Sequence, residues 1–261
     1  MHAHHAATIE KVIAHFEQVP GVQALLLGGS IAHGFATPAS DVDIMILVPD
    51  AEYEDRYRRQ DLTLYTHELS TYPGGYVDGK YVRATFLRQV SEKGSEPARF
   101  AFQDARVLFS RLDTLDYLLR AAVRYPVEGK AERLLRFRAQ LDAWNWYATE
   151  ALRLENRYLL TLAIGKLVLF GGRLILTHNE ALYPYHKWFL EVLSRVADKP
   201  GDLMDRIRNL YDDPSAASVD AFYQTVKDFQ DWPEPTLGWG NQFAMDNELT
   251  WLNGGPSVDD L

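Results

Sequence analysis

The stretch that decides the fold is LGGSIAHGFATPASDVDIMILV, residues 27–48. A short apolar run ends at Leu27 and predicts a buried strand, which the turn Gly28-Gly29-Ser30 follows directly. After a helical turn and a loop, residues 41–48 form a second, nearly unbroken apolar run, which is typical of a central strand. The stretch therefore predicts strand, glycine turn, loop and strand.

Two carboxylates open the second of these strands. Asp41 and Asp43 are two residues apart, so in a strand they point to the same face, about 7 Å apart along the chain. Five apolar residues follow Asp43, and a carboxylate beside such a run is costly to bury without a partner or a metal. Hard oxygen ligands suit Mg²⁺, which takes one or two protein carboxylates and fills its other positions with water and phosphate.

The glycine turn is the second half of this pattern. Free backbone N–H groups of Gly28 and Gly29, with the Ser30 hydroxyl as a further donor, can hold a phosphate. Turn and carboxylates together predict a nucleoside triphosphate that is held through its Mg²⁺. Each half also has a plain structural interpretation, since glycine and aspartate are both common where loops begin and end.

Around this stretch the hydrophobic period changes once along the chain. Apolar residues at helical spacing predict a first helix that ends before Pro20-Gly21. Period-two patterns then predict strands at 62–69, 76–82 and 107–109, and from about residue 112 to 229 the pattern is helical only. We therefore expect an α+β chain with a sheet domain at 1–110 and a helical bundle at 111–261. Its last stretch, 232–261, is expected to be an irregular tail on the surface.

Composition excludes several classes of function. The 261 residues include no cysteine, which excludes disulfides, thiolate metal sites and cysteine nucleophiles. The net charge of −9 counts against binding to a phosphate backbone. The N-terminal segment lacks the pattern of a signal peptide, and the longest apolar stretch is interrupted by Lys166, so we expect a cytoplasmic protein without a membrane span. His2, His4 and His5 are expected in a mobile end rather than in a metal site.

Leu27-Gly28-Gly29-Ser30 followed by Ser40-Asp41-Val42-Asp43-Ile44 resembles the signature of the DNA polymerase beta-like nucleotidyltransferase superfamily. Within it, the chain is similar to the small nucleotidyltransferases that modify aminoglycosides and lincosamides. The resemblance implies an N-terminal mixed β-sheet flanked by helices and an all-α C-terminal domain. It also implies transfer of a nucleoside monophosphate from a nucleoside triphosphate, with ATP expected, to a hydroxyl of a small-molecule acceptor, with release of pyrophosphate.

Such enzymes commonly use a third carboxylate on a later strand, either as a metal ligand or as the base that takes the acceptor proton. Asp78 matches best, because it is the acid that interrupts the expected strand 76–82; Asp78-Gly79 is also a turn dipeptide. The alternatives are Glu68 and Glu96. We therefore expect Asp41, Asp43 and Asp78 to be the catalytic and metal-binding residues, with two Mg²⁺ ions between them and the triphosphate.

Cations from the helical part are expected to complete the triphosphate site. Lys166 lies in an otherwise apolar helix, and Lys187 follows it as the second candidate; a surface or snorkelling lysine is the competing interpretation of each. The acidic balance suits a polycationic acceptor such as an aminoglycoside. Four acids are candidates to surround its amines: Glu96, Asp104, Glu150 and Glu155.

Three other functions remain open on the sequence. The first is a nucleotidyltransferase that modifies tRNA or a partner protein, as toxins of toxin–antitoxin systems do. The second is a nuclease, because Arg173 and His178 resemble the Arg-x4–6-His motif of HEPN-type ribonucleases. The third is a nucleotide-binding protein without activity, which the intact pair of aspartates counts against. A homodimer is compatible with any of them.

Overall fold

The computed structural model describes residues 1–254 and 258. The chain divides into two compact units, Met1–Arg124 and Tyr125–Leu261. This division lies beyond the expected one after residue 110, because helix α6 (Leu115–Ala122) packs its buried Leu115 and Leu118 into the core of the first unit.

The first unit is built on one five-stranded sheet. Its order is β3-β4-β2-β1-β5, in which β2 and β4 are parallel and the other neighbours antiparallel. The mixed sheet implied by the resemblance is therefore confirmed, and all five expected strands are present. Their bounds are β1 Ala24–Leu27, β2 Val42–Leu47, β3 Thr63–Thr66, β4 Val77–Val82 and β5 Arg106–Ser110.

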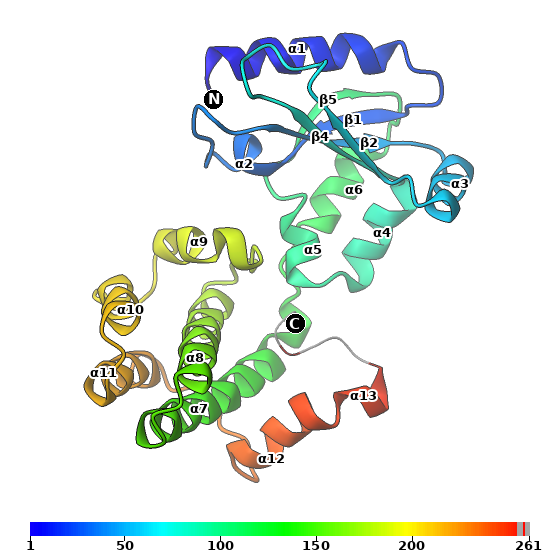
Figure 1. Cartoon of the computed structure of the whole chain (residues 1–261). Helices are drawn as coiled ribbons and strands as arrows, with labels where there is room; N and C mark the ends of the chain where they lie inside the picture. Colours follow the sequence, from blue (N-terminus) through cyan, green and yellow to red (C-terminus); the bar gives the residue numbers. More distant parts are fainter. Residues whose placement is uncertain (255–257, 259–261) are drawn as a thin grey trace. The chain divides into compact units, whose positions relative to one another are not determined.

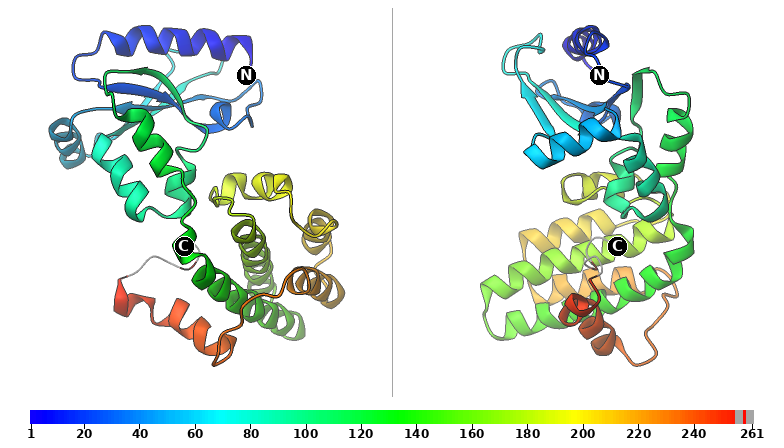
Figure 2. Two further views of the ribbon diagram at one scale, coloured as in Figure 1. Left: turned by 180° about the vertical axis from the view of Figure 1, so that it is seen from behind. Right: turned by 90° about the vertical axis from the view of Figure 1, so that its right-hand side faces the viewer.

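Helices cover both faces of this sheet (Figures 1 and 2). Helix α1 (Ala3–Glu17) packs on one face, where Leu25 and Leu27 point, while Ala24 and Leu26 point to the other face with α4 (Ala84–Lys93) and α6. This alternation is the period of two that a strand imposes on its side chains. Three further helices lie in the connections: α2 Gly29–Ala32, α3 Asp50–Arg59 and α5 Glu96–Phe100.

The sequence patterns did not predict α3. It has no buried residue, and its sequence DAEYEDRYRR lacks an apolar stripe. Charge pairs stabilise it instead, among them Glu52 with Arg56, 3.0 Å apart at a spacing of four residues.

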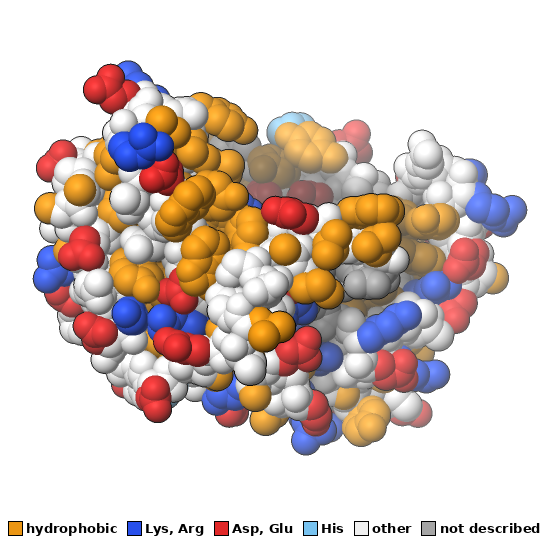
Figure 3. Space-filling model, turned by 90° about the horizontal axis from the view of Figure 1, so that it is seen from below, with side chains coloured by type: hydrophobic (Ala, Val, Ile, Leu, Met, Phe, Trp, Pro, Cys, Tyr) orange, Lys and Arg blue, Asp and Glu red, His pale blue; other side chains and the backbone are white. Residues whose placement is uncertain are grey.

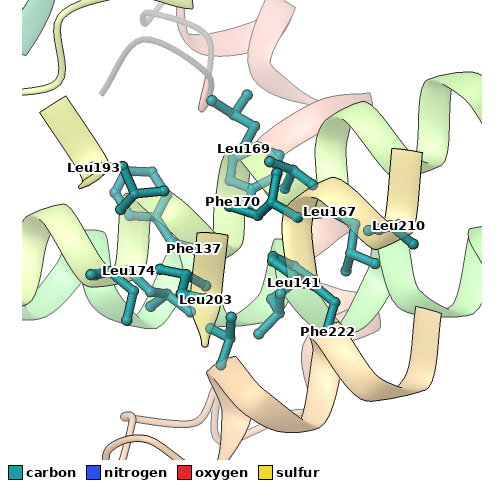
Figure 4. Close-up of a cluster of buried hydrophobic side chains, with 14 of the residues drawn as sticks. Phe137, Leu141, Leu167, Leu169, Phe170, Leu174, Leu193, Leu203, Leu210 and Phe222 are labelled. Atoms are coloured by element: carbon teal, nitrogen blue, oxygen red, sulfur yellow. The ribbon is translucent and has the colours of Figure 1, made fainter. Parts of the chain in front are cut away.

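The second unit is all-helical, as predicted. Its long helices are α7 (Lys130–Arg153) and α8 (Arg157–His178), and the break expected near Asn156 is real: the Asn156 side chain accepts a 3.1 Å hydrogen bond from the Leu159 N–H and caps α8. Figure 4 shows the core of this unit, to which α7 contributes Phe137 and α8 contributes Phe170. The other elements of this part are η1 Val127–Gly129, η2 His186–Trp188, α9 Phe189–Arg195, α10 Leu203–Asp212 and α11 Ala216–Lys227.

The expected irregular tail is wrong for most of its described residues. It forms α12 (Trp239–Phe243), the π-helical turn η3 (Ala244–Glu248) and α13 (Thr250–Asn253). The turn is anchored by Asp246, which is buried against Arg136 of α7. Its periodicity is hidden because the buried anchor is a charged residue rather than an apolar one. Residues 255–257 and 259–261 of the expected tail lie outside the described residues.

Among the described residues, one helix, α8, is long and apolar enough to cross a membrane. However, 67% of its most apolar 18-residue window is buried inside the structure, as in the core helix of a bundle. On the face of the helical unit in Figure 3, acidic and basic side chains are interspersed around gathered apolar ones.

Candidate metal and nucleotide site

Three carboxylates meet at one end of strands β2 and β4. Asp41 immediately precedes β2, Asp43 is its second residue and Asp78 is the second residue of β4. One carboxylate oxygen from each lies within 4.8 Å of the others. Three acids at this spacing can share a divalent cation.

The parallel pairing of β2 and β4 explains this cluster. Asp43 and Asp78 are direct partners in the register, so they sit at the same level and point to the same face of the sheet. Val42 and Ile44 point to the opposite face, into the core beneath α1. The apolar run after Asp43 thus fixes the strand in the sheet, and the alternation places the carboxylate on the site face.

Asp78 takes the third position, and the two alternative acids do not. Glu68 is an exposed residue after β3, and Glu96 is buried at the start of α5; neither belongs to the acidic group. Gly79 is not a turn residue but is paired inside β4, with Leu64 and Ile44 opposite.

The glycine turn lies directly against this cluster. Gly29 has φ +59°, and a Cβ atom there would lie 1.7 Å from Oδ2 of Asp43, so only glycine fits. The Gly28 N–H donates a 2.9 Å hydrogen bond to the Asp43 carbonyl, so it is not free for a phosphate, contrary to the expectation from the sequence. The close approach of turn and carboxylate that the sequence motif predicts is therefore present.

Ser30 follows at the start of α2. Its side chain is buried, and its Oγ has no hydrogen-bond partner among the residues that the structure describes. Such a hydroxyl is costly unless something binds it. A phosphate oxygen beside the acidic group would accept its hydrogen.

Two tyrosines that the sequence did not single out surround Asp41. The Asp41 charge, together with a hydrogen bond from the Tyr76 hydroxyl to its carboxylate, raises the pKa of Tyr76. Burial and the same charge raise the pKa of Tyr72. Both phenols therefore stay protonated and can donate hydrogen bonds. Aromatic residues are so common in cores that no sequence signal distinguishes these two.

The two lysines predicted to bind the triphosphate lie in the helical unit. Lys166, on α8, lines a pocket of about 560 Å³ together with Leu162 and Tyr211. Lys187, in η2, places its ammonium 5.0 Å from the centre of the Trp188 ring. Their part in triphosphate binding stays a prediction.

Arg173 and His178 occupy structural positions. Arg173 is fully buried, with its guanidinium carbon 4.4 Å from the Phe137 ring centre and 4.2 Å from that of Tyr183. His178 ends α8, and its Nε2 lies 2.6 Å from Oδ2 of Asp198. A nuclease needs its arginine at the RNA phosphate, so the burial of Arg173 favours packing over catalysis.

The four acids considered for acceptor amines lie on different elements, two in each unit. Asp104 lies 3.2 Å from Nδ1 of His33, Glu150 pairs with Arg153 and Glu96 is buried. Glu155 is exposed after α7, at a left-handed φ of 51°.

The chain was compared with protein families, solved structures and curated proteins. Residues 9–92 match the family model described as a nucleotidyltransferase domain. A solved structure described as a nucleotidyltransferase-like protein from Exiguobacterium sibiricum is 13% identical to the chain; the match covers 96% of this chain and 91% of that one, with a TM-score of 0.46. No curated protein matches the sequence.

Proposed function

We propose that this chain, whose residues 9–92 match a nucleotidyltransferase domain, is a nucleotidyltransferase that transfers a nucleoside monophosphate to a hydroxyl of a small-molecule acceptor. The donor is a nucleoside triphosphate, expected to be ATP, and the other product is pyrophosphate. The observation that carries this proposal is the acidic group of Asp41, Asp43 and Asp78, within 4.8 Å of one another beside the Gly28-Gly29-Ser30 turn.

The donor set fits Mg²⁺. Three like charges so close together repel one another, and hard oxygen ligands are those that Mg²⁺ prefers. When bound, two such ions would neutralise the charge that develops on the transferred phosphoryl group and align it with the attacking hydroxyl. Ser30 adds a hydroxyl that has no hydrogen-bond partner within the described part of the chain, and a triphosphate oxygen would accept its hydrogen.

Each residue then has a distinct role. Asp41 and Asp43 hold the cations, and the turn with Ser30 binds the triphosphate. Asp78 either completes the metal site or accepts the proton that leaves the acceptor hydroxyl as its oxygen bonds to the α-phosphorus. The bond between the α-phosphorus and the oxygen that links it to the β-phosphate breaks, and pyrophosphate leaves with that oxygen.

The acceptor class rests on charge. A net charge of −9 favours a polycationic, hydroxyl-rich molecule of the aminoglycoside type over an RNA. A lincosamide-like molecule is the second candidate acceptor. The interspersed charges on the helical face in Figure 3 also give tRNA no continuous basic surface there. We place the reaction in the cytoplasm, where nucleoside triphosphates are available.

The test is a transfer assay with each of the four α-³²P-labelled nucleoside triphosphates, Mg²⁺ and a panel of aminoglycosides and lincosamides. We expect label on one acceptor class, release of pyrophosphate, and loss of both with EDTA. Label on tRNA or on a protein instead would replace the small-molecule acceptor by the macromolecular one. No labelled product with any acceptor would overturn the proposal.

A further inference from the structure

The first turn of α1 holds the loop that carries Asp41. Asp43 and Asp78 lie within strands, where the ladder fixes the backbone, but Asp41 precedes β2 and follows the loop 37–40. His4 Nε2 lies 3.0 Å from the Pro38 carbonyl oxygen, and His5 Nε2 lies 3.0 Å from the Ser40 carbonyl oxygen. His4 and His5 thus lie in helix α1 and contact this loop, contrary to the mobile end expected from the sequence.

The Ser40 carbonyl accepts a second hydrogen bond, from the hydroxyl of Tyr72, at 2.5 Å. The Ser40 carbonyl and the Asp41 N–H belong to one planar peptide group. Two hydrogen bonds hold the carbonyl oxygen of this group. They therefore also hold the orientation of the peptide plane that precedes the Asp41 Cα.

The protonation of His5 is set by its neighbours. Its Nδ1 faces the N–H of His2 at 3.5 Å and so acts as the acceptor, which leaves the hydrogen on Nε2, where it can be donated to Ser40. The ring is fully buried. It also meets the ring of Tyr72 edge-on, with 5.5 Å between the ring centres.

A second set of hydrogen bonds ties the Tyr72 segment to the same helix. The Thr71 hydroxyl donates to the His4 carbonyl at 3.0 Å, and the Thr71 N–H donates to Oγ1 of Thr8 at 3.1 Å. Thr8, like His5, is fully buried. The two donors that meet at Ser40 are therefore anchored to one rigid element.

We propose that His5 and Tyr72 are positioning residues for Asp41, which hold its backbone so that its carboxylate meets those of Asp43 and Asp78. This inference rests on the proposed function, because it assigns these two residues to the metal site of the nucleotidyl transfer. Neither residue belongs to the acidic group itself; each acts through the Ser40 peptide.

The test is an electron paramagnetic resonance titration with Mn²⁺ on the full chain without nucleotide. Tyr72→Phe removes one hydroxyl and keeps the ring, and His5→Leu removes the imidazole donor. We expect each to weaken Mn²⁺ binding about 10-fold, as removing outer-shell partners of metal ligands does. His5→Gln, which restores an N–H donor at a similar reach, should recover most of the affinity. Tyr57→Phe on α3 and His15→Gln on α1, both exposed, should bind Mn²⁺ like the parent.

The transfer assay gives a second readout. In Tyr72→Phe the Mg²⁺ concentration for half-maximal activity should rise while the KM of the acceptor stays unchanged, which a general loss of stability would not produce. If His5→Leu does not fold, the Mn²⁺ affinity of Tyr72→Phe decides, and a value equal to that of the parent would refute the positioning role.

The outcomes separate the two proposals. Parent-like Mn²⁺ binding in Tyr72→Phe and His5→Leu, with loss of binding in Asp43→Asn, would refute the positioning role and leave the metal site intact. Failure of the parent to bind Mn²⁺, or undiminished binding in Asp43→Asn, would refute the metal site itself.

Discussion

The two units contain contrasting arrangements of carboxylates. In the helical unit, the buried Asp246 and the half-buried Asp142 contact guanidinium groups: Arg136 Nε donates to Asp246 at 2.8 Å, and Arg138 Nε donates to Asp142 at 3.2 Å. In the sheet unit, three carboxylates gather within 4.8 Å of one another. Opposite charges in contact stabilise the fold when both are present, whereas like charges in contact destabilise it.

This difference distinguishes charged residues that stabilise the fold from charged residues that are available for binding. Paired charges are explained by the fold, and so is Arg173, which lies between the rings of Phe137 and Tyr183. Like charges on a half-buried strand end repel one another, and such a group can bind a cation supplied from outside the chain. Four changes test this distinction.

The largest effect is expected for Asp43→Asn. Removing one of the three charges should lower nucleotidyl transfer by about 10³-fold, because the cation loses a ligand that acts on the transition state. Without Mg²⁺ the same change should leave the free energy of unfolding unchanged or increase it, since repulsion is relieved. Transfer assays and urea unfolding measure the two. Asp113→Asn, an exposed aspartate before α6, is the control that should alter neither.

Gly29→Ala should lower nucleotidyl transfer nearly as much as Asp43→Asn, for a steric reason. The left-handed φ costs about 1–2 kcal/mol for alanine, and the overlap with the Asp43 carboxylate adds about 1–3 kcal/mol. Gly34→Ala is the matched control: its φ is +76°, but nothing lies within 4 Å of the new Cβ. Gly34→Ala should lower the free energy of unfolding only by the backbone cost of about 1–2 kcal/mol and should keep most of the activity. Equal losses of activity in the two variants would show that backbone strain alone matters.

Arg136→Met should destabilise the helical unit by about 3 kcal/mol, because it leaves the Asp246 carboxylate buried without its guanidinium. Glu132→Gln is its control: this carboxylate lies 3.8 Å from Arg136 but is 74% exposed, so the change should cost about 0.5 kcal/mol or less. Chemical unfolding compares the two. A cost for Arg136→Met no larger than that for Glu132→Gln would contradict the structural role of the pair.

The smallest effect concerns pH. Burial raises the pKa of the Asp246 carboxyl, although hydrogen bonds from Gln242 and Arg136 act in the opposite direction. The folded state therefore binds this proton more tightly than the unfolded state. The stability that the parent has over Asp246→Asn should be greatest below the unfolded pKa of about 3.9 and fall as the pH rises through the folded pKa. Urea unfolding of both proteins across this range measures the difference, and an increase with pH would show that the ion pair outweighs burial.

Local signals were sufficient for much of this molecule. Strands β1 and β2, the helix break at Asn156 and the pairing of a glycine turn with Asp41 and Asp43 follow from periods and turn chemistry that neighbouring residues carry. Helix α3 was not predicted from the hydrophobic pattern, because charge pairs and not an apolar stripe stabilise it. The helical turn η3 was not predicted, because the residue that anchors it, Asp246, is a buried charge whose partner Arg136 is 110 positions away in the sequence.

The sequence by itself determined the succession of strands and helices, the two aspartates on one face and the glycine turn before them, because these depend on periodicity and on spacing along a few residues. Only the tertiary structure decided that Asp78 and not Glu68 or Glu96 completes the acidic group, since this depends on β4 lying parallel to β2 in a fixed register. It also decided that His5 and Tyr72 meet at Ser40. Contacts between residues 32 or more positions apart are made by packing, and no local pattern encodes them.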